Sequence, residues 1–245
     1  MTWWEALLLG LIQGLTEFIP VSSSGHLVLG QYLLGLDKEA ADVTFEVFVH
    51  FGTVLSILTV YWDDVAELVE EAWAGLRAPR AVPTRFAEND TFRLGVFILV
   101  TLVPTGVAYV LFREPLEQAF GSPRFTSAML VGTGVLLLLT RIGPRPDGDL
   151  SGVKAFVVGV AQSCALVPGI SRSGATICVA LYQNVEPGRA ANFSFLMLLP
   201  VVLGGTVLKG LELMEQGVGA AGLSLGIGTV AAYGSGIGAI YVVLD

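Results

Sequence analysis

Long runs of apolar residues place the strongest constraint on the fold of this chain. A membrane-spanning helix needs about 20 mostly apolar residues, and residues 44–62, 92–112, 193–214 and 218–244 form such runs. A fifth run, residues 125–140, is shorter but fits the same role. Only 14% of the 245 residues are charged and 53% are hydrophobic, whereas a soluble domain carries about 25% charged residues. The sequence therefore predicts an all-α polytopic membrane protein with about five full spans.

The charged residues exclude one class of partner and suggest an orientation. With 21 acidic and 13 basic residues, the net charge is −8, which excludes a nucleic-acid partner. The loops 63–91, 141–152 and 184–192 hold six arginines, whereas the connections 113–124 and 216–217 hold two. Because basic residues are enriched in cytoplasmic loops, we expect the first three loops in the cytoplasm.

Two further apolar segments, residues 3–36 and 153–183, are each broken near the middle by a polar stretch. The first break reads EFIPVSSSGH at residues 17–26, and the second reads PGISRSG at residues 168–174. Each half has only about 10–15 residues and is too short to cross a bilayer alone. We therefore predict two re-entrant helical hairpins, each entering and leaving on one side of the membrane.

An internal repeat relates these two breaks. The Gly-x-x-Gln sequence at 10–13 and the serine cluster at 22–25 both recur 149 positions later, at 159–162 and 171–174. Downstream, Phe45-Glu46-Val47 loosely resembles Phe193-Ser194-Phe195. With three spans between equivalent points, the second copy enters from the opposite face. We therefore predict a single integral membrane domain, 1–245, made of two inverted-topology repeats at about 1–112 and 125–245.

Serine- and glycine-rich breaks that open helices point to anion binding. The first backbone N–H groups of a helix are unpaired, and with the helix dipole they attract anions. Arg172 adds a bidentate phosphate donor that a lysine does not equal. The alternative interpretation is that the serines only cap helices. The candidate substrate-binding residues are Ser22, Ser24, Gly25, Ser171, Ser173 and Gly174.

Four ionisable residues at membrane depth complete a set of groups suited to phosphoryl transfer. Such groups are costly in lipid and usually face a cavity. Glu17 and His26 flank the first serine cluster, whereas Glu46 and His50 are four apart on one helix face and form either part of the cavity or a local hydrogen bond. Phosphoryl transfer requires a nucleophile, a proton acceptor and positive charge near the phosphoryl oxygens. A site among lipid-facing spans predicts a phosphate carried on a lipid, and Glu17 with a diphosphate could hold a divalent cation.

Residues 13–26 and 168–174 resemble the two signature motifs of the undecaprenyl-diphosphate phosphatases, the bacitracin-resistance family, and the resemblance extends to about residue 244. It implies a hydrolase that removes the terminal phosphate from a polyprenyl diphosphate and so recycles the lipid carrier for cell-envelope glycan synthesis. It also implies a divalent cation, Mg²⁺ or Ca²⁺, a multi-pass location in the cell membrane among membrane lipids, and a site open to the extracytoplasmic side. The resemblance leaves open whether the protein forms a homodimer.

The resemblance also implies residue roles. Glu17 matches the family's carboxylate for metal binding and catalysis, and Gln13 matches a position where some members have a second, metal-binding glutamate. Ser23 matches the proposed nucleophile, and His26 the histidine that works beside it. Whether Ser23 attacks covalently or only orients a water stays open. The diphosphate-binding cluster corresponds to Ser171, Arg172 and Ser173.

Two alternatives and one departure accompany this interpretation. A lipid-phosphate flippase or transporter also uses inverted repeats with broken helices, but transport needs no nucleophile such as Ser23. Phosphatases that form a phosphohistidine need a histidine after Ser171-Arg172, and none follows. Family members usually continue with one more span, whereas this chain ends at Asp245. We therefore expect a sixth span to be missing and the C-terminus to lie in the cytoplasm.

Overall fold

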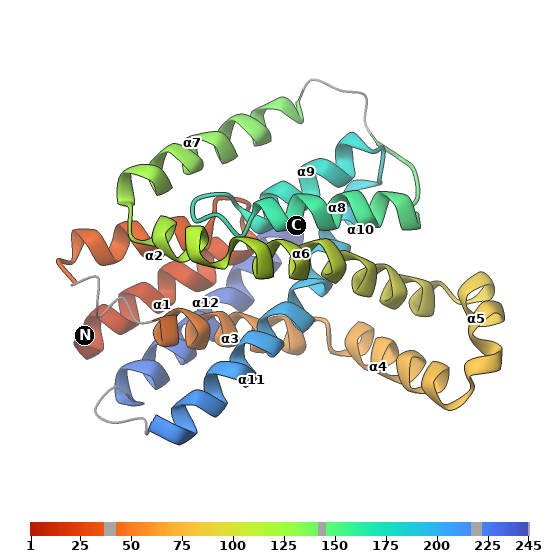
Figure 1. Cartoon of the computed structure of the whole chain (residues 1–245), viewed down its shortest axis with the longest axis horizontal. Helices are drawn as coiled ribbons and strands as arrows, with labels where there is room; N and C mark the ends of the chain where they lie inside the picture. Colours follow the sequence, from red (N-terminus) through yellow and green to blue (C-terminus); the bar gives the residue numbers. More distant parts are fainter. Residues whose placement is uncertain (37–42, 142–145, 217–221, 245) are drawn as a thin grey trace.

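The computed structural model describes residues 1–36, 43–141, 146–216 and 222–244, and this part of the chain is almost entirely helical (Figure 1). The expected all-α architecture is confirmed. A short 3₁₀ turn, η1 (Pro79–Ala81), separates α4 from α5. In chain order the helices are α1 (Trp3–Phe18), α2 (Ser23–Leu33), α3 (Val43–Val60), α4 (Trp62–Arg77), α5 (Val82–Glu88), α6 (Asp90–Phe120), α7 (Pro123–Leu139), α8 (Gly152–Cys164), α9 (Arg172–Tyr182), α10 (Pro187–Leu196), α11 (Leu198–Gln216) and α12 (Gly222–Leu244).

Several of these helices suit a membrane by length and composition. Within the described residues three candidate spans qualify, namely Asp90–Phe120, Pro187–Val207 and Gly222–Val243. A fourth qualifies if Thr44–Val60 and Trp62–Arg77, bent by 91°, are taken as one span. These findings fit a polytopic membrane protein. The finer expectation of five spans stays a prediction, because α7, which holds the short fifth run, has only 17 residues.

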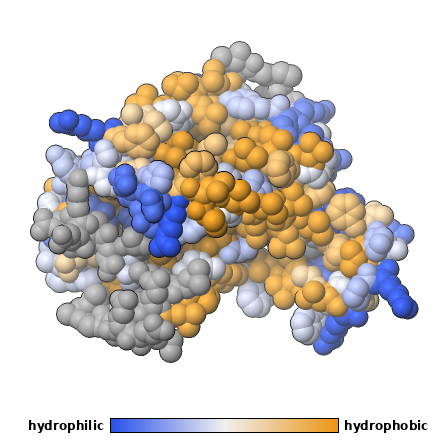
Figure 2. All heavy atoms as spheres, viewed as in Figure 1, coloured by the Kyte–Doolittle hydropathy of each residue, from blue (hydrophilic) through white to orange (hydrophobic). Residues whose placement is uncertain are grey.

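The outer surface is apolar, as expected for a protein that faces lipid. Figure 2 shows hydrophobic side chains over much of the visible face. Val110 on α6 is 77% exposed and Val230 on α12 is 68% exposed. Soluble monomers rarely expose contiguous apolar surface of this kind, so the natural neighbour of this surface is the acyl region of a bilayer.

Both broken apolar segments form pairs of short helices. α1 packs against α2, and α8 packs against α9. The four helices have 16, 11, 13 and 11 residues, below the about 20 residues that a span needs. The predicted breaks therefore coincide with real chain reversals between packed helices.

The predicted run at 193–214 differs in detail from the helices observed. The helix begins earlier, at Pro187, and is interrupted at Met197 between α10 and α11. Pro200 explains the interruption, because it lacks the N–H that would bond to the carbonyl of residue 196, and its ring displaces that carbonyl. Of the run predicted at 218–244, the first residues, 218–221, lie outside the described part.

Close packing of α12 holds α1 and α3 together. α12 packs against both α1 and α3, which also contact each other. At Gly14 of α1, an added Cβ would lie 2.0 Å from Ser235 Oγ and 2.4 Å from the carbonyl oxygen of Ala232. Only glycine permits that approach. The polar residues of α3 are thereby held near the C-terminal end of α1.

An aromatic cluster fixes the C-terminal end of α1 against α10. Phe18 and Phe195 are fully buried and meet edge to face, with ring centroids 5.6 Å apart. Tyr61 also contacts Phe195, with ring centroids 6.3 Å apart. Such edge-to-face pairs are favourable beyond their buried area. Phe18 directly follows Glu17, so this cluster sets the position of the Glu17 carboxylate.

Candidate functional site

Each break ends in a capped helix N-terminus. The Ser22 hydroxyl accepts a hydrogen bond from the Gly25 amide at 3.3 Å, and the Ser171 hydroxyl accepts one from the Gly174 amide at 3.0 Å. Ser22 adopts a φ of 70°, in the left-handed region that non-glycine residues rarely occupy. These two serines therefore cap their helices, and both also line the cavity described below. The neighbouring Ser23 and Ser173 form hydrogen bonds to Glu17 instead.

An ion pair joins the two breaks across the repeat. Arg172 donates from Nη2 to Glu17 Oε1 at 2.9 Å, and the two side chains are only 15% and 5% exposed. Ser173 Oγ donates to the Glu17 carbonyl oxygen at 3.3 Å. The guanidinium is held from behind by the carbonyl oxygen of Ser194, 2.5 Å from Nη1. The two motifs therefore meet in the structure.

The Glu17 carboxylate connects the remaining polar groups. Ser23 Oγ donates to Glu17 Oε2 at 2.5 Å, and Gln13 Nε2 donates to the same oxygen at 2.9 Å. His50 Nε2 lies 3.5 Å from that oxygen. A carboxylate beside a serine hydroxyl can accept its proton. Glu17 thus occupies the position of a base for Ser23.

The two histidines differ in their relation to this carboxylate. His26 Nδ1 lies 2.8 Å from the Ser22 carbonyl oxygen, one turn back on its own helix, and His26 is not among the described residues that line the cavity. His50 Nδ1 donates to the Glu46 carbonyl oxygen at 2.7 Å, which directs Nε2 toward Glu17. The predicted role of His26 beside Ser23 stays a prediction. For His50 the sequence allowed either a place in the cavity or a local hydrogen bond. In the structure His50 lines the cavity and also forms a local hydrogen bond.

A cavity of about 210 Å³ opens onto these groups. Its wall includes helix termini from both repeats, apolar residues of α11 such as Leu198 and Val202, and Phe120 of α6. The polar lining residues are Glu17, Ser22, Ser23, Ser24, Glu46, His50, Thr105, Gln162, Ser171, Arg172 and Ser173. A small polar cavity with an apolar side suits a phosphate head group attached to a lipid.

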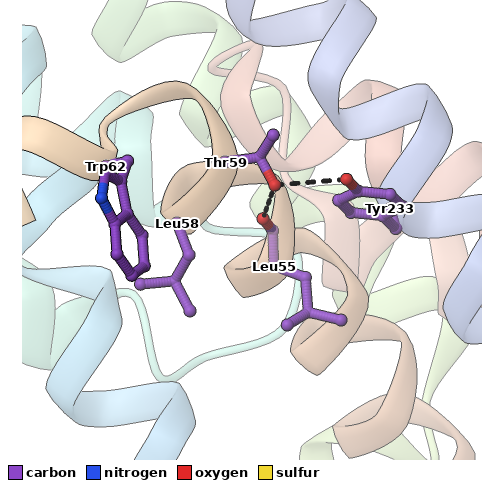
Figure 3. Close-up of a pocket in the computed structure, with 5 residues that line it drawn as sticks. All are labelled: Leu55, Leu58, Thr59, Trp62 and Tyr233. Atoms are coloured by element: carbon purple, nitrogen blue, oxygen red, sulfur yellow. Dashed lines mark hydrogen bonds between the residues drawn. The ribbon is translucent and has the colours of Figure 1, made fainter.

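A larger hollow of about 520 Å³ lies between α3, the start of α4 and α12 (Figure 3). Leu55, Leu58 and Trp62 line it together with Thr59 and Tyr233. The hydroxyls of Thr59 and Tyr233 lie 3.2 Å apart, and Thr59 also donates to the Leu55 carbonyl oxygen at 2.8 Å. Because its lining has no titratable pair and no free cation among the described residues, this hollow offers no phosphoryl chemistry.

Most predicted residues are in the cavity, and a few are not. Gln13, Gly25 and Gly174 are absent from its lining in the described part, although Gln13 supports Glu17 from behind and the two glycine amides bond to the capping serines. The sequence interpretation missed Thr105, Gln162 and Ser194. The repeat signalled two of these, since Gln162 corresponds to Gln13, and Ser194 lies in the segment that resembles the one around Glu46. Thr105 belongs to no motif.

The cavity offers oxygen donors of the kind that a divalent cation needs. Mg²⁺ and Ca²⁺ take hard oxygen ligands, and Mg²⁺ is usually held by one or two carboxylates plus substrate phosphates. Glu17 and Glu46 both line the cavity, and Gln13 Oε1 is buried without a partner among the described residues. The same part of the chain holds no cluster of three histidine, cysteine or acidic residues suited to a metal. The residues therefore fit an ion held largely by the substrate's oxygens.

Comparisons with known proteins agree on one family. The family described as "Bacitracin resistance protein BacA" matches residues 6–245. A relative named undecaprenyl-diphosphatase, from Salinibacter ruber (strain DSM 13855 / M31), is 99% identical over all 245 residues, which cover 91% of that protein. A relative of the same name from Bacteroides fragilis is 40% identical over 242 residues, covering 96% of this chain and 86% of the relative. Undecaprenyl-diphosphatase 3 of Bacillus anthracis is 42% identical over 205 residues, covering 83% of this chain and 73% of the relative.

Proposed function

The chain belongs to the family of bacitracin resistance protein BacA and is an undecaprenyl-diphosphatase, and we propose that it hydrolyses its lipid diphosphate in the cavity where the two breaks meet. The reaction releases inorganic phosphate and leaves the lipid monophosphate, so it recycles the lipid carrier of cell-envelope glycan synthesis. The observation that carries this assignment is the 2.5 Å hydrogen bond from Ser23 to Glu17, directly beside Arg172.

The binding step uses the positive groups of the cavity. Arg172 Nε is buried without a partner among the described residues, and a phosphoryl oxygen would supply the acceptor that it lacks. The N-termini of α2 and α9 add backbone N–H groups and the positive ends of two helix dipoles. Ser24 and Ser173 add hydroxyls in the same lining. These donors can hold the charge that develops on the transferred phosphoryl group.

The chemical step follows from the contact between Ser23 and Glu17. Ser23 Oγ attacks the terminal phosphorus, the bond from phosphorus to the bridging oxygen breaks, and the Ser23 proton passes through Glu17 to the departing lipid phosphate. Water then attacks the phosphoserine, which releases inorganic phosphate and restores the hydroxyl. A divalent cation, Mg²⁺ or Ca²⁺, held by Glu17 and supported by Gln13, would neutralise diphosphate charge. Direct attack by water is the alternative route.

A transporter for the same lipid phosphate remains the second candidate. It would need the anion donors but not the proton acceptor beside Ser23. Transport also gives no reason for a buried serine to donate a 2.5 Å hydrogen bond to a carboxylate. The hydrolase is therefore the better account of the site.

The membrane topology belongs to this proposal as well. Two inverted repeats, two re-entrant hairpins, five spans and a cavity open to the extracytoplasmic side are supported by the short paired helices, the repeated motifs and the arginine-rich segment that includes α4 and α5. Cysteines introduced at Arg80 and at Ser122, in a variant lacking Cys164 and Cys178, would be treated with a membrane-impermeant maleimide in intact cells. Labelling at position 122 only is expected, and labelling at position 80 only would reverse the orientation.

The activity is tested by phosphate release from undecaprenyl diphosphate in detergent, with and without a chelator. We expect release that stops with chelator and returns with Mg²⁺ or Ca²⁺. Ser23→Ala should abolish turnover, and acid quenching of the unaltered enzyme should trap phosphate on Ser23. No trapped phosphate together with residual turnover of Ser23→Ala would favour direct attack by water, and no phosphate release at all would refute the assignment of hydrolysis to this chain.

A further inference from the structure

Gln162 of α8 is a buried polar residue of the cavity that the mechanism above does not use. It is 3% exposed and lines the same cavity as Ser23 and Arg172. Its repeat counterpart, Gln13, donates to Glu17 four residues later. In the second repeat the equivalent position is Leu166, so Gln162 has no carboxylate of its own to support.

A hydrogen-bond chain fixes the orientation of the Gln162 amide. Thr105 Oγ1 on α6 has two carbonyl acceptors for its single proton, that of Thr101 at 2.9 Å and that of Gly159 at 3.4 Å. Thr105 Oγ1 can therefore only accept from Gln162, which donates from Nε2 at 3.0 Å. The amide oxygen, Oε1, is then turned away from Thr105, and it is buried without a partner among the described residues.

The chemistry of the unpaired Gln162 amide oxygen determines which kind of ligand it can bind. It accepts hydrogen bonds and donates none, so it repels the oxygens of a diphosphate, and it lacks the neighbouring carboxylate that Glu17 provides beside Gln13 for a cation. A buried acceptor without a partner is also costly to maintain. The reaction brings one neutral donor to the cavity, the water that hydrolyses the phosphoryl group. In GTPases a glutamine performs this task by orienting the attacking water.

We propose that Gln162 is a positioning residue that orients the attacking water through Oε1, with Thr105 holding the amide in place. This inference rests on the proposed hydrolase mechanism. One water proton is directed toward Gln162 Oε1, and a lone pair of the water oxygen forms the new bond to phosphorus. The bond from phosphorus to Ser23 Oγ breaks, one water proton stays on the inorganic phosphate, and the other passes through Glu17 to Ser23 Oγ.

The test compares Gln162→Met with the unaltered enzyme in detergent, using undecaprenyl diphosphate labelled in its terminal phosphate. Methionine keeps the length of the side chain and removes the acceptor oxygen. We expect kcat to fall on the order of 100-fold, the effect of misplacing a reacting group, with KM unchanged or lower. Because phosphorylation of Ser23 needs no water, the acid-quenched Gln162→Met variant should carry more protein-bound label than the acid-quenched unaltered enzyme.

A matched pair of variants examines the support from Thr105. Thr105→Val removes the hydroxyl that holds the amide and should reproduce a weaker form of the same defect. Thr105→Ser keeps the hydroxyl and should restore turnover. Gln162→Glu keeps an acceptor oxygen and should turn over faster than Gln162→Met, with a higher KM because of the added negative charge.

The outcomes separate this inference from the mechanism on which it rests. Unchanged kcat in Gln162→Met, a raised KM alone, or a lower melting temperature with no change in protein-bound label would overturn the role of Gln162. If neither enzyme traps label and Ser23→Ala still turns over, the covalent route is refuted. A kcat defect in Gln162→Met would then support water orientation in a single direct step.

Discussion

Replacing Arg172 by lysine tests whether the geometry of the guanidinium, and not its charge alone, supports the reaction. The guanidinium contacts Glu17 through Nη2 and the Ser194 carbonyl oxygen through Nη1, while Nε remains for a phosphoryl oxygen. A lysine ammonium is a single point of charge on a flexible stem and cannot hold three separated acceptors. Arg172→Lys therefore keeps the neutralising charge near Glu17 and loses a donor to the transition state.

The structure gives different magnitudes for activity and stability. Removing one fixed donor to developing charge costs about 100- to 1,000-fold in kcat, or about 2.7–4 kcal/mol. The folded state loses one hydrogen bond to a charged donor, at Ser194, which costs about 1.5–3 kcal/mol. We therefore expect Arg172→Lys to fold in detergent with a lowered melting temperature and to lose nearly all turnover.

The assay is phosphate release under saturating substrate, together with thermal unfolding of the same preparation. Arg189→Lys is a matched control, because Arg189 pairs with Asp149 at the surface and its side chain is 62% exposed. It should change neither quantity appreciably, since exposed ion pairs contribute about 0–1 kcal/mol. A near-normal kcat in Arg172→Lys would refute the reasoning. A raised KM with normal kcat would show that Arg172 binds ground state and transition state equally.

Three further perturbations have distinct expected results. Glu17→Gln should abolish turnover and lower the free energy of unfolding by about 3–5 kcal/mol, because it leaves the buried charge of Arg172 uncompensated; unchanged thermal stability would contradict the buried ion pair. Gly169→Ala should cost about 1–3 kcal/mol in thermal unfolding, since Gly169 has a φ of 94° and an added Cβ would lie 2.3 Å from a carbonyl oxygen of α7. Gly134→Ala, on α7 with open space around it, is the control and should show no such loss. Backbone amides of residues 189 and 188 hold the pKa of Glu186 below its ordinary value, so its contribution to stability is present above the ordinary carboxyl pKa and is lost as the pH falls through the lowered value. Unfolding measured against pH should therefore show a smaller acid loss in Glu186→Gln, and identical pH profiles would oppose this.

The residues within the two breaks could be predicted because they are locally conspicuous. A glutamate and an arginine inside apolar segments have few functions other than facing a cavity. Inverted symmetry can bring two such breaks together, and in the structure Glu17 and Arg172 are 2.9 Å apart. Predictions of this kind succeed because the cost of burying charge in an apolar protein permits few arrangements.

Other site residues depend on tertiary packing that the sequence does not display. His26 follows Ser23 closely in the chain, but its ring bonds to the carbonyl oxygen one turn earlier on α2. His50 reaches Glu17 from α3, because α12 packs against both α1 and α3. Thr105 and Ser194 lie inside helices, where a hydroxyl often bonds to its own helix backbone. Their contacts with Gln162 and Arg172 follow from how α6 and α10 pack.

The buried charges of the site explain how the proposed base can be stable at rest and reactive with substrate. At rest the Glu17 carboxylate faces Arg172, Ser23 and Gln13, so its burial is compensated by donors on both oxygens. A diphosphate that approaches Arg172 Nε competes for the same guanidinium charge. In a medium of low dielectric constant, that competition weakens the hold of Arg172 on Glu17. In the proposed mechanism the carboxylate therefore becomes a stronger acceptor for the Ser23 proton when the substrate's phosphoryl group is in place, which couples activation of the nucleophile to binding.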